Sequence, residues 1–315
     1  MKRRGTRNSG GRGHLLTEQH NPNTRDLDVL PIGDAFDVMN AEDSTVPAAV
    51  AHAKGPIVRM IRRVSEAWRC GGRLIYVGAG TSGRLGVLDA AECPPTFRSS
   101  PQMVRGVVAG GKKALWRSVE GAEDDPAAAR AAIRELDVCV KDVVLGIASG
   151  GTTPYVHAAL GEAKQRGATT AFLACVPKSQ VEVACDIDIR VLVAAEVLSG
   201  STRLKAGTAT KLVLNMITTL GMVRLGKTYG NLMVDLNSHA CRKLVDRATR
   251  VVSDATGLPG PEAARLLRAA RGRAKTAIVM HLLTISRAEA EALLARNSGH
   301  VGEALGRRRR REIRE

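Results

Sequence analysis

The feature that most constrains the fold is a repeated unit in which a short apolar run ends in a loop of glycine, serine and threonine and a helical pattern follows. Continuous apolar runs of this length are typical of strands that are buried on both faces of a sheet. Strands that alternate with helices predict an α/β fold, a doubly wound parallel sheet. The three apolar runs and their loops are residues 74–77 with 78–83, 143–148 with 149–153, and 187–194 with 199–202.

The pattern becomes purely helical beyond about residue 237, which predicts a small C-terminal helical bundle. Both ends of the chain are strongly basic and carry more than half of the formal net charge of +16. Runs of like charge are usually solvated ends, so nucleic acid is not an expected partner. The predicted organisation is a basic disordered tail (1–16), an N-terminal arm (17–44), a sheet domain (45–236), a helical domain (237–305) and a second basic tail (306–315).

The composition argues against several other classes of protein. No apolar run reaches the roughly 18 residues of a membrane-spanning helix, so no membrane partner is expected. The six cysteines lie singly without a CxxC pair, which indicates free thiols and a cytoplasmic protein. The seven histidines show no metal-ligand spacing, so no metal is expected.

The loops at the strand ends carry the candidate ligand-binding groups. Residues 78–83 match the GxGxxG pattern of a dinucleotide site, but the next strand ends without the acid that would bind a ribose hydroxyl. Hydroxyl groups and free N–H groups at helix starts favour an anion. Because three such loops follow strands of one parallel sheet, the pattern favours a phosphate ligand over a nicotinamide cofactor.

Carboxylates remain as candidates for the chemistry, since neither a metal cluster nor a GxSxG nucleophile elbow is present. Glu92 precedes two prolines, and Glu120 and Glu123 flank an acidic turn. Taken one at a time, each of these acids also fits a solvated loop residue.

Longer motifs resemble a known family, the N-acetylmuramic acid 6-phosphate etherases. The resemblance covers about residues 17–305, and its motifs are residues 71–96, 119–124, 153–156, 200–209 and 230–235. It implies a sugar isomerase (SIS) sheet domain with a helical C-terminal part, a homodimer, and a lyase without a cofactor. It also implies cleavage of the lactyl ether of N-acetylmuramic acid 6-phosphate to N-acetylglucosamine 6-phosphate and D-lactate.

By the same resemblance, Glu92 is the expected proton donor and Glu123 the expected base. The alternative is a non-catalytic SIS-domain sensor of sugar phosphates, against which the presence of both acids argues. The second loop departs from the family pattern at Gly150, where a serine is usual. Loop chemistry and the family motifs together give the predicted substrate-binding residues: Gly80, Thr81, Ser82, Arg84, Ser149, Gly150, Gly151, Thr152, Thr153, Glu196, Ser201 and Lys205.

Overall fold

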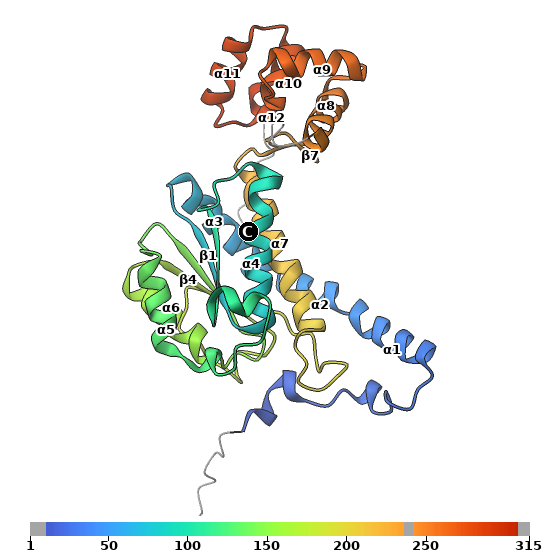
Figure 1. The fold of residues 1–315 in the computed structure, drawn as a ribbon, viewed down its shortest axis with the longest axis vertical. Coiled ribbons are helices and arrows are strands. Elements are labelled where there is room, and N and C mark those ends of the chain that lie inside the picture. The colour runs from blue at the N-terminus through green and yellow to red at the C-terminus, as the bar shows by residue number, and fades with distance from the viewer. Residues whose placement is uncertain (1–10, 236–241, 308–315) are drawn as a thin grey trace, which may run out of the picture. The chain divides into compact units, whose positions relative to one another are not determined.

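The computed structural model describes residues 11–235 and 242–307, which form two compact units (Figure 1). We call the first the sheet unit; it consists of Met1–Met60, Leu74–Val87 and Gly106–Asn215. The second, the helical unit, consists of Ile61–Arg73, Leu88–Arg105 and Met216–Glu315. The units interleave along the sequence, whereas the predicted domains followed one another.

A five-stranded sheet forms the centre of the sheet unit, with the strand order β2-β1-β3-β4-β5. The pairs β1–β3, β3–β4 and β4–β5 are parallel, and Leu74 of β1 lies opposite Val143 of β3. The prediction of an α/β fold with a parallel sheet is therefore confirmed. The strands are β1 (Leu74–Gly78), β2 (Val104–Val108), β3 (Val143–Ile147), β4 (Thr169–Ala174) and β5 (Ile187–Arg190).

Helices pack on both faces of this sheet, as a doubly wound fold requires. On one face Gly146 of β3 leaves room for Val156 and Leu160 of α6 (Pro154–Gln165), against which α5 (Pro126–Glu135) also packs. On the other face Gly86 of α4 (Gly80–Phe97) lies against Tyr76 of β1, where a Cβ atom would approach the tyrosine Cβ to 2.8 Å.

Three helices precede the sheet where one long helical pattern is visible in the sequence: α1 (Ile32–Ser44), α2 (Val46–His52) and α3 (Lys54–Arg69). Short 3-10 helices at Arg12–His14, Leu16–Glu18 and Pro22–Thr24 lie before them. Leu15 is only 1% exposed and belongs to the core that α6 covers. Residues 11–16 were predicted to belong to a disordered tail, and for these residues the prediction is wrong. They are ordered because Leu15 is buried in an apolar environment that only the folded sheet provides.

The helical unit contains the predicted C-terminal bundle around its own apolar core. A two-stranded antiparallel hairpin, β6 (Thr228–Tyr229) and β7 (Leu232–Met233), follows α7 (Lys205–Arg224). The hairpin and the shortest helix were not predicted, because two to four residues are too few to show a period. The bundle helices are α8 (Arg242–Thr256), α9 (Gly260–Ala269), α10 (Ala274–Leu283), α11 (Arg287–Arg296) and α12 (Val301–Ala304).

Two properties of the described residues bear on the predicted environment of the protein. Within 11–235 and 242–307, no helix has the length and apolar character needed to cross a membrane. Five cysteines in these ranges are free thiols, and burial raises the pKa of Cys175 to about 12. A thiol with so high a pKa is unreactive at neutral pH.

Candidate functional site

The first predicted loop is a tight connection between β1 and α4. A Cβ atom at Gly78 would lie 2.6 Å from the backbone nitrogen of Gly83, and Gly80 has a φ of +52°. The glycines of the GxGxxG pattern are therefore explained by this turn, without a dinucleotide. Thr81 and Ser82 lie in the first turn of α4, where backbone N–H groups have no partner within the helix.

The second loop connects β3 to α6. Pro154 is the first residue of α6, and Thr153 precedes it without a side-chain capping hydrogen bond. Ser149 is buried, and its carbonyl oxygen accepts a hydrogen bond from the Cys175 backbone nitrogen at 2.8 Å. The backbone of the loop is thus fixed by the residue that follows β4, and the loop carries the hydroxyl groups of Thr152 and Thr153 for a ligand.

These loops line one cavity of about 230 Å³, which we call the loop cavity. Gly200 and Thr202 of the third loop also line it, and Glu123 completes the lining with its carboxylate. The strand order places the ends of β1 and β3 side by side. The chain adds β2 on one side of β1 and β3 to β5 on the other, and ligands of such folds usually bind at this switch in strand order. The predicted residues that line the loop cavity are Gly80, Thr81, Ser82, Ser149, Gly150, Thr152, Thr153 and Glu123.

Glu123 also lines a second cavity of about 290 Å³, which we call the acidic cavity. The two cavities share Ala79, Gly80 and Glu123, so this carboxylate lies between them. Arg84 lines the acidic cavity together with Glu120. Its Nε atom donates to the Ala114 carbonyl oxygen at 2.8 Å, which fixes the 3-10 helix at Gly111–Leu115.

Glu196 and Lys205 line neither cavity and are fully buried, at 0% and 1% exposure. The Glu196 carboxylate accepts from the backbone nitrogens of Lys205 and Ala206 at 2.9 Å each and so caps α7. Burial raises the pKa of Glu196 in spite of these N–H groups. The Lys205 ammonium donates to Glu42 of α1 at 2.6 Å. Both side chains thus have structural partners, and their part in substrate binding stays a prediction.

Three further predicted residues also lie outside the lining of the two cavities: Gly151, Ser201 and Glu92. Gly151 has a φ of +81°, and its carbonyl oxygen contacts His157 Nε2 at 2.6 Å. Glu92 is exposed on α4, and at about 1.5 Å per helical residue it lies about 18 Å along the helix from Gly80. The catalytic assignment of Glu92 therefore rests on the family motif and not on its position.

Sequence reasoning missed the contribution of the N-terminal segment to the loop cavity, which Arg12, Leu15 and Glu18 line. Arg12 was grouped with the basic tail, because a single arginine in a charged run carries no positional signal. Glu18 lies inside the span of the family resemblance, but no motif singled it out.

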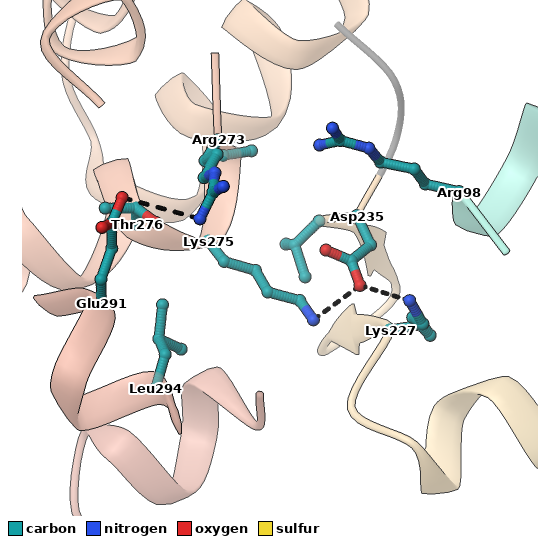
Figure 2. Close-up of a pocket in the computed structure, with 10 residues that line it drawn as sticks. Arg98, Lys227, Asp235, Arg273, Lys275, Thr276, Glu291 and Leu294 are labelled. Carbon is teal, nitrogen blue, oxygen red and sulfur yellow. Dashed lines mark hydrogen bonds and ion pairs between the residues drawn. The ribbon is translucent and has the colours of Figure 1, made fainter. Parts of the chain in front are cut away.

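A third cavity, of about 360 Å³, lies within the helical unit (Figure 2). Asp235 binds the Lys227 ammonium at 2.9 Å and the Lys275 ammonium at 2.8 Å. Burial alone would raise the pKa of Asp235, but the two ammonium groups outweigh it and leave that pKa lowered. None of the predicted site residues lines this cavity, whose ion pairs join the hairpin to α10.

A doubly wound sheet whose hydroxyl-bearing loops meet beside a carboxylate defines an α/β protein with a candidate anion site at the ends of its strands. The family model of the glucokinase regulatory protein N-terminal SIS domain matches residues 56–164. A solved structure of phosphoheptose isomerase from Neisseria gonorrhoeae is similar with a TM-score of 0.46 at 16% identity, over 61% of this chain and 98% of that one.

Curated relatives give the particular family. An N-acetylmuramic acid 6-phosphate etherase of Crocosphaera subtropica is 53% identical over 93% of this chain and 96% of its own length. An etherase of the same name from Synechococcus elongatus is 53% identical over 93% of this chain and 95% of its own length. This chain belongs to the N-acetylmuramic acid 6-phosphate etherase family.

Proposed function

We propose that this protein is a lyase that cleaves the D-lactyl ether of N-acetylmuramic acid 6-phosphate, in the recycling of cell-wall amino sugars. The products are N-acetylglucosamine 6-phosphate and D-lactate. The observation that carries the proposal is that one cavity combines two hydroxyl-bearing loops at helix starts with the carboxylate of Glu123. The loops suit the phosphate, and the carboxylate suits proton removal.

The first step is removal of a proton from the substrate. When the sugar ring opens, the hydrogen on carbon 2 lies next to an aldehyde and becomes acidic. Glu123 takes this proton as the base, and the electron pair forms a double bond between carbons 2 and 3 while the lactyl oxygen leaves carbon 3. The position of Glu123 between two cavities supports this role, because a sugar whose phosphate occupies the loops can extend past the carboxylate.

The second step is protonation of the leaving group followed by hydration. An alkoxide leaves readily at neutral pH only if an acid protonates it, and Glu92 is the proposed donor. Glu92, now a carboxylate, takes a proton from water as the hydroxide adds to carbon 3, and Glu123 returns its proton to carbon 2. This gives N-acetylglucosamine 6-phosphate and restores both acids to their starting states. No cofactor takes part in this scheme.

We further propose that the protein acts in the cytoplasm as a homodimer. Because Glu92 is exposed and lines neither cavity, a second copy of the chain is the proposed source of this acid. Mixing inactive Glu92→Gln and Glu123→Gln proteins tests this idea. Random reassociation makes about half of the dimers mixed, each with one intact site of two, so about a quarter of wild-type activity returns. No recovery, with exchange of subunits demonstrated, contradicts a shared site.

The decisive experiment for the function incubates the purified protein with N-acetylmuramic acid 6-phosphate and measures D-lactate. N-acetylmuramic acid without the phosphate is the matched control, since only the phosphorylated sugar can use the loop hydroxyls and N–H groups. The similarity to a regulatory SIS domain supports the alternative of a non-catalytic sensor. Tight binding of the phosphorylated sugar without any release of lactate would establish the sensor instead.

A further inference from the structure

The N-terminal segment from Arg12 to Glu18 is held against the sheet unit by specific contacts. Gln180 binds both sides of it: its Oε1 accepts from the Leu16 backbone nitrogen at 2.9 Å, and its Nε2 donates to the His14 carbonyl oxygen at 2.9 Å. Leu15 between them is buried in the core. These contacts hold Arg12 and Glu18 in the lining of the loop cavity.

Arg12 lies in the lining of the loop cavity, and its guanidinium N–H donors make no hydrogen bond to the described side chains around it. Among the described residues, the only polar contact of its side chain is with Glu123, whose carboxylate lies 3.9 Å from Arg12 Nη1. That distance is too long for a hydrogen bond, and the two side chains are 54% and 47% exposed. An exposed ion pair of this kind contributes little to the stability of the fold, so the position of Arg12 beside Glu123 is not explained by stability.

A second arginine, Arg84, lines the acidic cavity together with Glu123, but its guanidinium group is held by two backbone carbonyl oxygens. Its Nε donates to the Ala114 carbonyl oxygen, and its Nη2 donates to the Arg117 carbonyl oxygen at 3.4 Å. Arg12, by contrast, lines the loop cavity itself, and its guanidinium group makes no hydrogen bond within the described residues that would hold it in another orientation.

We propose that Arg12 forms a carboxylate subsite that binds the lactyl carboxylate of the substrate. This inference rests on the proposed function. The substrate carries two anionic groups, a phosphate on carbon 6 and a carboxylate on the ether substituent of carbon 3. The base takes the proton of carbon 2, so a cation beside the base lies beside the substituent of carbon 3. Guanidinium and carboxylate groups match as a planar pair with two parallel hydrogen bonds.

The subsite has a consequence for specificity. N-acetylglucosamine 6-phosphate carries the same phosphate but no carboxylate, so it gains nothing from Arg12. A single arginine thus distinguishes the substrate from the product and favours release of the sugar once lactate has left.

The test compares the two sugars on the same variants. KM and kcat are measured by lactate release for wild type, Arg12→Gln and Arg12→Lys. Dissociation constants for N-acetylmuramic acid 6-phosphate and N-acetylglucosamine 6-phosphate are measured by calorimetry for the same three forms with Glu92→Gln added, which slows turnover during the titration. For the substrate in Arg12→Gln, we expect KM and the dissociation constant to rise about tenfold to a hundredfold, the range for a lost charge-assisted hydrogen bond. Arg12→Lys should be intermediate, and the affinity for N-acetylglucosamine 6-phosphate should stay within about twofold in both variants. Arg25→Gln is the matched control, because Arg25 also lies before the sheet, in the N-terminal arm, and lines a different cavity.

Each other outcome overturns the subsite. An equal loss for both sugars means that Arg12 binds the phosphate or only seats the segment, and no loss for either means that it is a surface residue. Failure of the proposed function is a separate result: wild-type protein would then release no lactate, while calorimetry would still report whether Arg12 distinguishes the two sugars.

Discussion

Replacing Lys205 by methionine tests whether the ion pair between α7 and α1 is structural. Lys205 is 1% exposed and donates to Glu42 at 2.6 Å, and the Glu42 side chain is 13% exposed. Methionine fills the space of the lysine stem but leaves the Glu42 carboxylate without its ammonium partner. We expect the folded protein to lose stability while the affinity for substrate stays unchanged, because Lys205 lines neither cavity of the proposed site.

The size of the stability loss in Lys205→Met follows from the burial of the Glu42–Lys205 ion pair. Removing one partner of a buried ion pair costs about 3–5 kcal/mol. Glu42 keeps the hydrogen bond from Asn23 Nδ2 at 2.8 Å and a little solvent contact, which places the cost near the lower end, about 3 kcal/mol. Replacing both charges in a Glu42→Gln/Lys205→Met protein removes the unpaired charge, so the double variant should lose less than the sum of the single ones.

The loss of stability in Lys205→Met should depend on pH, and the pKa of Glu42 gives the direction. Burial alone would raise the pKa of Glu42, but hydrogen bonds from Asn23 and Lys205 outweigh it and leave that pKa below its ordinary value of 4.5. A lowered carboxylate pKa stabilises the folded state above pH 4.5, and this contribution is lost as the pH falls through the folded pKa. The difference in stability between wild type and Lys205→Met should therefore narrow below pH 4.5.

Urea unfolding at several pH values measures the loss of stability, and lactate release at a temperature where the variant is folded measures KM. Lys211→Met is the control, since Lys211 is exposed on the same helix and should change stability by no more than about 0.5 kcal/mol. The reasoning is refuted if Lys205→Met unfolds like wild type and instead raises KM tenfold. Lys205 would then bind substrate, as the family motif predicts.

Three further predictions concern the loops and the acids. Ser82→Ala should raise the substrate dissociation constant roughly tenfold, as expected for a lost hydrogen bond to phosphate, and an unchanged value in calorimetry would remove Ser82 from the site. Gly150→Ser should raise the free energy of unfolding by about 1 kcal/mol through a hydrogen bond to Thr17. A Cβ there would lie 3.4 Å from the buried Thr17 Oγ1, which has no hydrogen-bond partner among the described residues; a lower KM with unchanged stability would contradict this prediction. By NMR in deuterated water, Glu123→Gln should abolish exchange of the carbon 2 hydrogen, whereas Glu92→Gln should keep some exchange and slow lactate release about 10²–10⁴-fold. The reverse pattern would exchange the two roles.

The sequence predicted those parts of the fold that depend on local periodicity. The strands β1 and β3 end within one residue of the predicted apolar runs, because a strand that is buried on both faces is apolar along its whole length. The hydroxyl groups and glycines of the loops at residues 78–83 and 149–153 likewise predict an anion site from sequence alone. The parallel order of the strands then brought those loops to one cavity.

Other features of the structure depend on contacts between distant residues, which leave no local pattern in the sequence. Glu42 and Lys205 are 163 residues apart in the sequence, and only the packing of α1 near α7 makes them partners. Leu16 and Gln180 are 164 residues apart, and their hydrogen bond helps to bring Arg12 from a charged run into a cavity wall. The sequence by itself therefore determined the layers of the fold, the chemistry of the loops and the family of the protein. Only the tertiary structure decided which charged side chains reach the cavity and which are neutralised within the fold, because the partner of a charge is set by the packing of elements that are far apart in the chain.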